Sequence, residues 1–371
     1  MKNFRSLFVK GQNLSVRILT ILMISSVFVA CNDDDDNDST KPSYKDGAII
    51  LNEGAWGKSN ASVSFLSKQN KNVSGNIFKT ANGNDAVLGD VLMDMTVANN
   101  EAFLVLNASN HVSVVNRETF EWVTNIENLN NPRFIAKHND HLYVTQWGGA
   151  TGEVVVINPV GHEIVKTIKT GLGTEGILVH NDLIWVANSG GYSTDNTVSV
   201  IDPGTNSVVS TIQTPDGPKH FAVDKEDYIW VVCYGSTIYD NATWELIEET
   251  PSYLAKISGV SKEIVREIKI SDQNHPSHIG ISPDGETIYT ADSRGVFAMP
   301  INAEAFPEAP FIANSGNFYG FSVHPDNGEL YVFVVPAWDK SGSIEIYNPT
   351  NGVLTQTLSD GLGIGPSRIV F

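Results

Sequence analysis

Cysteine is almost absent from this chain, whose 371 residues contain only Cys31 and Cys233. Two cysteines can form one bridge at most, so a disulfide-stapled fold is excluded. The sequence also lacks the His/Cys spacings of metal sites, the serine nucleophile elbow and the glycine-rich phosphate loop. We therefore expect a non-enzymatic protein with no catalytic residue, no metal site and no intrinsic cofactor.

Basic residues are scarce too: 24 Lys and Arg stand against 42 Asp and Glu, a net charge of −18 at pH 7. A surface of that sign repels phosphate backbones and anionic headgroups. Nucleic acid is therefore not an expected partner. Cys233 ends the apolar run that begins at Ile229, and we expect it to be a small buried residue.

The charge-free run 18–30 is too short to span a bilayer, which takes about 20 apolar residues. Residues 1–30 carry four basic and no acidic side chains, and the segment leads into Ala30-Cys31. This pattern resembles a bacterial lipoprotein box, in which the cysteine is lipidated. We expect a lipoprotein signal peptide over residues 1–30 and a lipid anchor at Cys31. A plain secretory signal with an incidental cysteine is the alternative.

Acidic residues dominate the segment that follows, from Asp33 to Asp38. A charge run of this kind is typical of a solvated tether. Its position after a lipidated cysteine also resembles the export signal of Bacteroidota surface lipoproteins. The sequence thus predicts a lipidated acidic tether over residues 31–46 and a place on the outer membrane, facing the cell exterior.

What the rest of the chain contains is a repeat. Each copy of roughly 40–45 residues holds four short runs rich in Val, Ile, Thr and aromatic residues, which is typical of a propeller blade. Three successive runs of the repeat are easily seen at 183–188, 197–202 and 208–212, at 142–145, 154–158 and 164–168, and at 330–333, 343–347 and 354–358.

The two ends of the repeat region complement each other. Strands are expected at 48–52, 62–66 and 73–78, and the last residues, 365–371, read as an inner strand. One C-terminal and three N-terminal strands would complete one blade. The sequence therefore predicts an all-β, seven-bladed β-propeller of four-stranded antiparallel blades over residues 47–371. An open β-sandwich leaves the final strand unexplained.

Candidate ligand-binding residues fall into two groups on one face of such a ring. Large aromatic residues, flanked by glycines, lie in loops between second and third strands, above all in the long loop 234–252. Polar residues and one tyrosine lie at the starts of inner strands. The expected ligand-binding set is Trp56, Arg133, Trp147, Glu175, Tyr192, His220, Tyr234, Trp244, His278, Tyr319, Trp338 and Arg368. Packing between blades is the alternative for any single aromatic residue.

Two catalytic or metal-binding interpretations stay open. Glu175 with His220 and His278 could form the carboxylate–imidazole set of a propeller lactonase, although no spacing rule supports it. His275 and His278, three residues apart, could contribute to a metal site, but both lie at the start of a strand.

The motifs Ile184–Asn188, Val198–Asp202 and Val208–Ile212 resemble those of the YncE-like propellers. Leu51-Asn52-Glu53-Gly54, Asn60-Ala61-Ser62, Asn82-Gly83 and Leu88-Gly89-Asp90 resemble a Bacteroidota surface-lipoprotein branch that includes the BtuG-type proteins. The resemblance implies capture of cobalamin, or a related corrinoid, outside the cell and its transfer to a TonB-dependent outer-membrane receptor. The cobalt would then arrive within the ligand. Binding of glycans or another nutrient is the first alternative, and a lactonase-like enzyme is the second.

Overall fold

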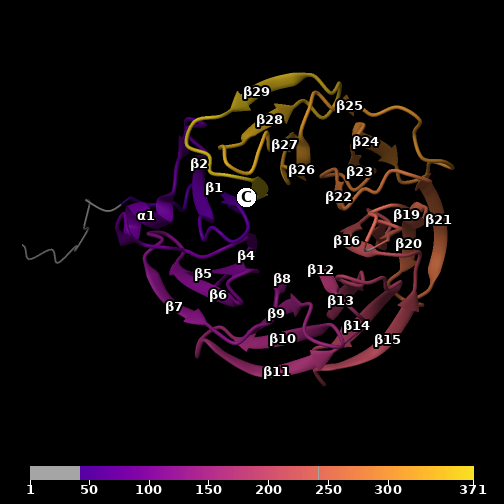
Figure 1. The fold of residues 1–371 in the computed structure, drawn as a ribbon, viewed down its shortest axis with the longest axis horizontal. Coiled ribbons are helices and arrows are strands. Elements are labelled where there is room, and N and C mark those ends of the chain that lie inside the picture. Colours follow the sequence, from indigo (N-terminus) through magenta and orange to yellow (C-terminus); the bar gives the residue numbers. More distant parts are fainter. Residues whose placement is uncertain (1–41, 241) are drawn as a thin grey trace, which may run out of the picture. The chain divides into compact units, whose positions relative to one another are not determined.

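The computed structural model of this protein describes residues 42–240 and 242–371. Its strands form seven four-stranded antiparallel sheets, and Figure 1 shows them arranged in a ring as the blades of a β-propeller. This confirms the predicted fold class. The predicted signal peptide over residues 1–30, the lipid anchor at Cys31 and the tether as far as Lys41 lie outside the described residues.

We number the blades 1 to 7 and call the strand nearest the axis of each blade its inner strand. Blades 1 to 3 each use four consecutive strands: β4 (Leu92–Ala98), β5 (Glu101–Leu106), β6 (His111–Asn116) and β7 (Trp122–Ile126); β8 (Pro132–His138), β9 (His141–Gln146), β10 (Glu153–Asn158) and β11 (Glu163–Lys169); β12 (Thr174–His180), β13 (Leu183–Asn188), β14 (Thr197–Asp202) and β15 (Ser207–Gln213).

Blade 4 is interrupted by an extra two-stranded sheet, and blade 7 combines both ends of the propeller. Blades 4 to 7 are β16 (Pro218–Val223), β17 (Tyr228–Cys233), β20 (Ser252–Ser258) and β21 (Ile264–Ser271), with β18 (Ser236–Tyr239) and β19 (Leu246–Thr250) inserted; β22 (His278–Ile281), β23 (Thr287–Asp292), β24 (Gly295–Pro300) and β25 (Ile312–Ala313); β26 (Phe318–Val323), β27 (Leu330–Val334), β28 (Ser343–Tyr347) and β29 (Leu354–Leu358); and β30 (Pro366–Val370), β1 (Gly47–Asn52), β2 (Ser62–Ser67) and β3 (Val73–Ser74), followed by α1 (Ile77–Asn82).

Blade 7 closes the ring in the way that the sequence predicts. The last strand of the chain, β30, is its inner strand and pairs antiparallel with β1, which places Ile369 opposite Ile50. The inner strand of this blade therefore comes from one end of the chain and the other three strands from the other end. The ring cannot open here without the loss of this ladder.

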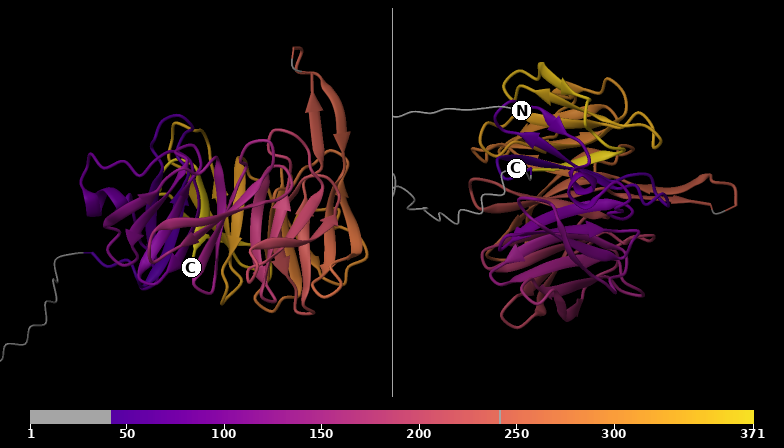
Figure 2. Two further views of the ribbon diagram at one scale, coloured as in Figure 1. Left: turned by 90° about the horizontal axis from the view of Figure 1, so that it is seen from below. Right: turned by 90° about the vertical axis from the view of Figure 1, so that its left-hand side faces the viewer.

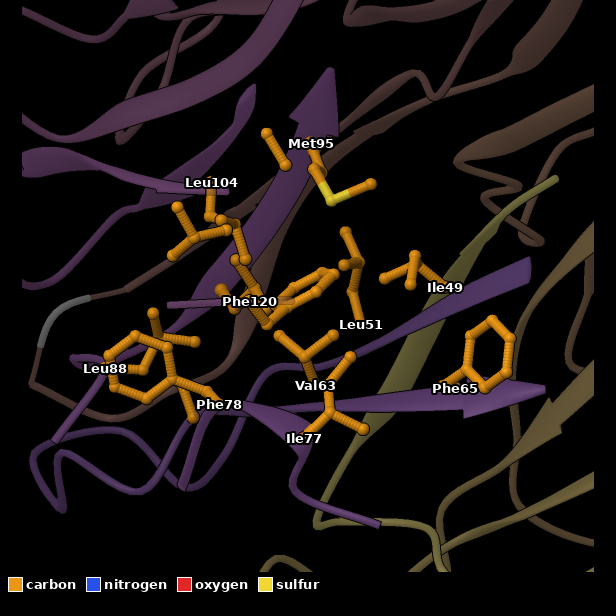
Figure 3. Close-up of a cluster of buried hydrophobic side chains, with 14 of the residues drawn as sticks. Ile49, Leu51, Val63, Phe65, Ile77, Phe78, Leu88, Met95, Leu104 and Phe120 are labelled. Atoms are coloured by element: carbon orange, nitrogen blue, oxygen red, sulfur yellow. The ribbon is translucent and has the colours of Figure 1, made fainter. Parts of the chain in front are cut away.

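The second strand of each blade is buried on both faces, because a neighbouring blade covers each face. In β1, Ile49 and Leu51 pack toward blade 1, whereas Ala48 and Ile50 pack toward blade 6. Alternate residues of a strand face opposite sides, so these strands read as unbroken apolar runs. Seven buried clusters fill the seven interfaces between blades, and Figure 3 shows the cluster between blades 7 and 1.

The outer edge of blade 7 differs from the prediction of a strand over 73–78. The chain forms only the short β3 and then turns into α1. Asn76 caps this helix by accepting a hydrogen bond from the backbone N–H of Lys79 at 3.2 Å. Ile77 and Phe78 are buried in the cluster between blades 7 and 1 (Figure 3). An outer strand has only one neighbour, so burial of these two side chains outweighs the few ladder bonds that a longer strand would add.

The segment 234–252, which the sequence analysis treats as a loop, is mostly a two-stranded ribbon. Among the strands of the described residues, β18 and β19 pair only with each other. Figure 2 shows this ribbon projecting from one face of the ring, on the side opposite the C-terminus. β-Branched residues on both sides of the connecting turn account for the strands, whereas the predicted loop followed from the length of the segment alone.

The buried residue Tyr44 bears on the predicted boundary between the tether and the propeller. Tyr44, within the segment predicted as a tether, packs edge-on against Phe65 and Phe120, with centroid distances of 5.3 and 5.8 Å. The packed part of the chain therefore begins before β1.

Cys233 is fully buried in β17, which confirms its role as a small core residue, and burial raises the pKa of its thiol.

Candidate functional site

The inner strands of six blades carry a β-bulge close to their first residue. In β16, Pro218 lies opposite Cys233 and His220 lies opposite Val232, which leaves Lys219 as the extra residue. A bulge changes the direction of a side chain and bends the strand. The corresponding extra residues in the other five strands are Met93, Tyr319 and Ser367, and the pairs Arg133–Phe134 and Glu175–Gly176. Three residues of the predicted set, Arg133, Glu175 and Tyr319, therefore lie at bulges.

We call the end of the ring where second strands lead into third strands the loop face, and the opposite end the turn face.

Glu175 is the charged centre of a group that we call the ion triad, which consists of Glu175, Arg133 and Lys219. The Glu175 carboxylate accepts from Arg133 Nε at 2.9 Å and from Lys219 Nζ at 3.3 Å. Burial alone would raise the pKa of Glu175, but the two cations outweigh it and lower the pKa to about 2. The carboxylate therefore stays ionised and holds both cations in place.

Glu53, just after β1, is a buried acid that the sequence analysis did not single out. The hydroxyl of Tyr319 donates to its carboxylate, at 3.1 and 3.0 Å from the two oxygens. Burial raises the pKa of Glu53 to about 7, although Tyr319 and the charge of Arg133 oppose the rise. The Tyr319 ring packs edge-on against Trp338 with a centroid distance of 5.3 Å. A titratable group therefore lies directly beneath one aromatic pair.

A second aromatic pair lines a cleft of about 360 Å³ on the loop face, between blades 2 and 3. Trp147 and Tyr192 meet edge-on there with a centroid distance of 4.8 Å. The guanidinium of Arg133 lies 4.9 Å from the Trp147 ring, in cation–π range. Trp147 Nε1 is buried without a hydrogen-bond partner in the part of the chain that the structure describes.

The other predicted aromatic residues also belong to the loop face but stand apart from these pairs. Trp56 follows β1 and is 80% exposed, and Trp244, in the turn of the ribbon, is 78% exposed. Tyr234 is half-buried, with Lys219 Nζ 5.8 Å from its ring centroid and the His275 ring at 4.8 Å. The predicted aromatic set is thus two close pairs and three separate rings rather than one cluster.

His220 and His278 lie on the inner strands of the adjacent blades 4 and 5. Their rings stack with a centroid distance of 5.9 Å, and Phe134 stands edge-on to His220 at 4.6 Å. Burial lowers both pKa values, and the positive charges of Arg368 and Lys219 lower them further, that of His278 to about 4. Both rings are therefore neutral at pH 7.

His275 and His278 do not share a site. The ring nitrogens of His275 contact the Tyr234 carbonyl oxygen at 2.6 Å and a Glu249 carboxylate oxygen at 2.8 Å, at the base of the ribbon. Across residues 42–240 and 242–371, no group of three or more His, Cys, Asp or Glu side chains is placed to hold a metal ion. The Glu175 carboxylate hydrogen-bonds to the ion-triad cations and to neither histidine of the lactonase interpretation.

A cavity of about 640 Å³, which we call the axial cavity, reaches from these residues to the turn face. Glu53, His220, His278 and Arg368 line its inner end, and the turn residues 282–285 line its outer end. Three of the predicted site residues therefore face a space that extends away from the aromatic pairs. The sequence predicts that several of these polar residues point along the central channel and bind the same ligand as the aromatic residues.

Asp94 in β4 is the second buried acid that the sequence analysis missed. It pairs with Arg368, Nε to Oδ1 at 2.9 Å, and accepts from the backbone N–H of Ile135 at 3.1 Å. Burial raises the pKa of Asp94, against the opposing charge of Arg368. The sequence does carry a signal for this residue, because Asp94 is the acid in the otherwise apolar start of β4.

Comparison with known proteins places the chain in a family. Residues 46–360 match the family described as a domain of unknown function, DUF5074. The chain belongs to the DUF5074 family. No curated protein matches the sequence. In the described part of this family member, no helix has the length and apolar character needed to cross a membrane.

Solved structures similar to this DUF5074 propeller show the fold alone, because their sequence identity is low. Hydrazine synthase of Kuenenia stuttgartiensis matches with a TM-score of 0.57 at 17% identity, over 74% of this chain and 88% of that one. A candidate 6-phosphogluconolactonase of Bacteroides fragilis matches with a TM-score of 0.62 at 10% identity, over 88% of this chain and 99% of that one.

Proposed function

We propose that this DUF5074 propeller is a binding protein that captures cobalamin, or a related corrinoid, on its loop face. The observation that carries the proposal is the set of exposed aromatic rings on that face, where Tyr192 is 94% exposed and Trp56 and Trp244 are 80% and 78% exposed. Several large aromatic rings exposed on one face, as close pairs and as single rings, are typical of a binding surface.

The chemistry of the loop face suits a corrinoid, which is a flat apolar ring edged with amide side chains. The Trp147–Tyr192 and Tyr319–Trp338 pairs offer ring edges and faces to the apolar part. Arg133, held by Glu175, offers donors to the amide oxygens. A closed ring of blades loses little conformational freedom on binding, which favours high affinity.

The cellular role rests on the N-terminal sequence and on the family resemblance. A lipid anchor at Cys31 and an acidic tether would hold the propeller outside the outer membrane. The motifs that resemble those of YncE-like propellers, and of the branch that includes BtuG-type proteins, support transfer of the ligand to a TonB-dependent receptor. The cobalt is part of the ligand, so the proposal requires no metal site in the protein.

Titration of the purified full-length protein with cyanocobalamin, followed by calorimetry and gel filtration, tests the proposal. We expect one-to-one binding and co-elution of the coloured ligand. Trp147→Ala and Trp338→Ala should each weaken binding by about tenfold, because a lost aromatic contact is worth about 0.5–1.5 kcal/mol beyond its buried area.

Trp122→Ala is the matched control, since Trp122 is 52% exposed on β7, an outer strand far from the loop-face residues in the blade. It should bind cyanocobalamin like the natural protein. The absence of binding at tens of micromolar ligand, where a site of about −7 kcal/mol would register, contradicts the proposal. So does equal weakening in all three variants.

A glycan is the second candidate ligand, favoured by the flat and highly exposed rings of Trp56 and Tyr192, since such rings also stack on sugars. In that case a glycan array should give binding that Trp56→Ala and Tyr192→Ala abolish. Cyanocobalamin should then fail to compete.

A further inference from the structure

We propose that the axial cavity is a second binding site, distinct from the loop face, for a small hydroxylated molecule that carries a phosphate or carboxylate group. The cavity has a volume of about 640 Å³ and reaches the turn face, whereas the aromatic pairs lie on the loop face. Arg368, His220 and His278 stand together at its inner end. This inference does not depend on the proposed corrinoid binding.

Arg368 supplies the group that would recognise the anion. Its Nε pairs with Asp94 at 2.9 Å, and the side chains are 43% and 4% exposed, so a buried carboxylate fixes an arginine that still reaches the cavity. Among residues 42–240 and 242–371, neither terminal nitrogen of Arg368 has a hydrogen-bond partner. Their planar fork matches the oxygens of a phosphate or a carboxylate.

The two histidines supply hydrogen-bonding groups for the remainder of the molecule. No described residue hydrogen-bonds to the ring of His220, and His278 uses only Nδ1, which lies 3.0 Å from Ser277 Oγ. A neutral imidazole has one donor and one acceptor nitrogen. Each ring can therefore donate to an anionic oxygen or accept from a hydroxyl group, which favours a polyhydroxylated ligand.

The charges around the inner end of the cavity favour an anion even though the chain as a whole carries −18. Three cations, Arg133, Lys219 and Arg368, lie there with two acids, Glu175 and Asp94, so the positive groups outnumber the negative ones. The positive charges of Arg368 and Lys219 also lower the pKa values of both histidines, after burial itself, which reports a positive local potential. Glu53 lies at the inner end of the cavity, and burial raises its pKa, which limits its repulsion of an anion; Asp224 and Asp284 line the outer part, near the turn face.

Three probes with one carbon skeleton test the site: glucose, gluconate and glucose 6-phosphate. In the full-length protein labelled at histidine, we expect millimolar gluconate or glucose 6-phosphate to shift the ring NMR signals of His220 and His278. Glucose at the same concentration should not. The anion that binds with the higher affinity shows whether the site prefers a carboxylate or a phosphate group.

Arg368→Lys keeps the charge opposite Asp94 but removes the fork, and should weaken binding of the better anion by about tenfold. Arg294→Lys is the matched control, because Arg294 pairs with Asp292 at 2.6 Å outside the cavity. Trp147→Ala should leave the affinity for this anion unchanged, because Trp147 lines the other cleft.

Three results would overturn the proposal: no shift of either ring with both anions at about 10 mM, equal binding of glucose and its charged analogues, or unchanged affinity in Arg368→Lys. The first two are read from the natural protein, so they remain decisive even if the variant fails to fold. Failure of cyanocobalamin binding would leave this test unaffected.

Discussion

The residue immediately before an inner strand is left-handed in six of the seven blades, the same six that carry a bulge. Asparagine or glycine occupies five of these positions, and Val91 occupies the sixth with φ 55°. Glycine adopts this conformation freely and asparagine does so with little strain, whereas a β-branched residue is an outlier there. The cost for an ordinary side chain is about 1–2 kcal/mol.

Val91→Asn should therefore raise the free energy of unfolding by about 1 kcal/mol, because asparagine relieves the left-handed strain. Urea unfolding monitored by fluorescence measures the change. Asn317→Val is the reverse substitution at an exposed position with φ 61° and should lower stability by a similar amount. A loss of stability in Val91→Asn would show that packing of the valine matters more than its backbone conformation.

Glu53 makes stability depend on pH in an unusual direction. Burial raises its pKa from 4.5 to about 7, so the folded chain binds this proton more tightly than the unfolded chain does. The resulting stabilisation is complete below pH 4.5 and is lost as the pH rises through 7. A shift of this size corresponds to about 3 kcal/mol.

Glu53→Gln keeps an oxygen that can accept from Tyr319 but removes the titration. Relative to the natural protein, we expect the variant to gain stability between pH 4.5 and 7, by up to about 3 kcal/mol. Urea unfolding over pH 4.5–8.5 measures this difference. His220 and His278, with lowered pKa values, destabilise both proteins as the pH falls below 6.5, so their effect cancels. If the difference in the free energy of unfolding between the two proteins does not change with pH, the raised pKa of Glu53 is contradicted.

The polar residues near the axis could be predicted only in part. Arg133 follows Asn131-Pro132 and Lys219 follows Pro218. A proline at the start of an inner strand recurs in the repeat, so the positions of these two residues could be predicted. Glu53 and Asp94 were missed because their importance comes from burial by other blades. The division between the loop face and the axial cavity could not be read either, since it depends on where the bulges place consecutive side chains.

At the scale of elements, the ribbon β18–β19 is the part least supported by its surroundings. It pairs only with itself, and its base is tied by His275, which contacts the Tyr234 carbonyl and Glu249 at 2.6 and 2.8 Å. Ser236 and Thr250 add hydrogen bonds to Thr194 and Asp216. The ribbon can therefore loosen without opening the blade.

His275→Ala should increase amide hydrogen exchange in β18 and β19 by about tenfold, with little change in global stability, because one of several anchors is lost. Hydrogen–deuterium exchange with mass spectrometry measures this. His162→Ala is the matched control, since His162 contacts Glu101 at 2.7 Å between blades 1 and 2. Unchanged exchange of the ribbon in His275→Ala, or equal loosening in the control, would contradict the anchoring role.

The strands themselves were largely predictable, because every second strand is covered on both faces and so reads as an apolar run. The two errors share one cause. The outer edge at 73–78 and the segment 234–252 each have few neighbours, so local capping and local pairing decide their structure. The pattern of apolar residues in a sequence reflects which strands are buried. Neither of these two segments is buried as a regular strand, so the pattern could not predict their structure.

At the scale of the whole molecule, closure of the ring by β30 and β1 creates two ends with different chemistry. The loop face carries the exposed aromatic rings, and the turn face receives the axial cavity. The ion triad of Glu175, Arg133 and Lys219 belongs to the loop-face side of the inner strands. One rigid scaffold thus offers two separate surfaces, and we propose that the loop face is the one that binds a corrinoid.

The most direct test is a crystal of the protein grown with cyanocobalamin and measured at the cobalt absorption edge. Cobalt scatters anomalously at this edge far more strongly than the light atoms of a polypeptide, so its signal locates the corrinoid without reference to any variant. We predict one cobalt per chain above the loop face, in reach of the Trp147–Tyr192 or Tyr319–Trp338 pair. Cobalt at the turn face or against the outer strands, or no ordered cobalt at saturating ligand, would contradict corrinoid binding at the loop face.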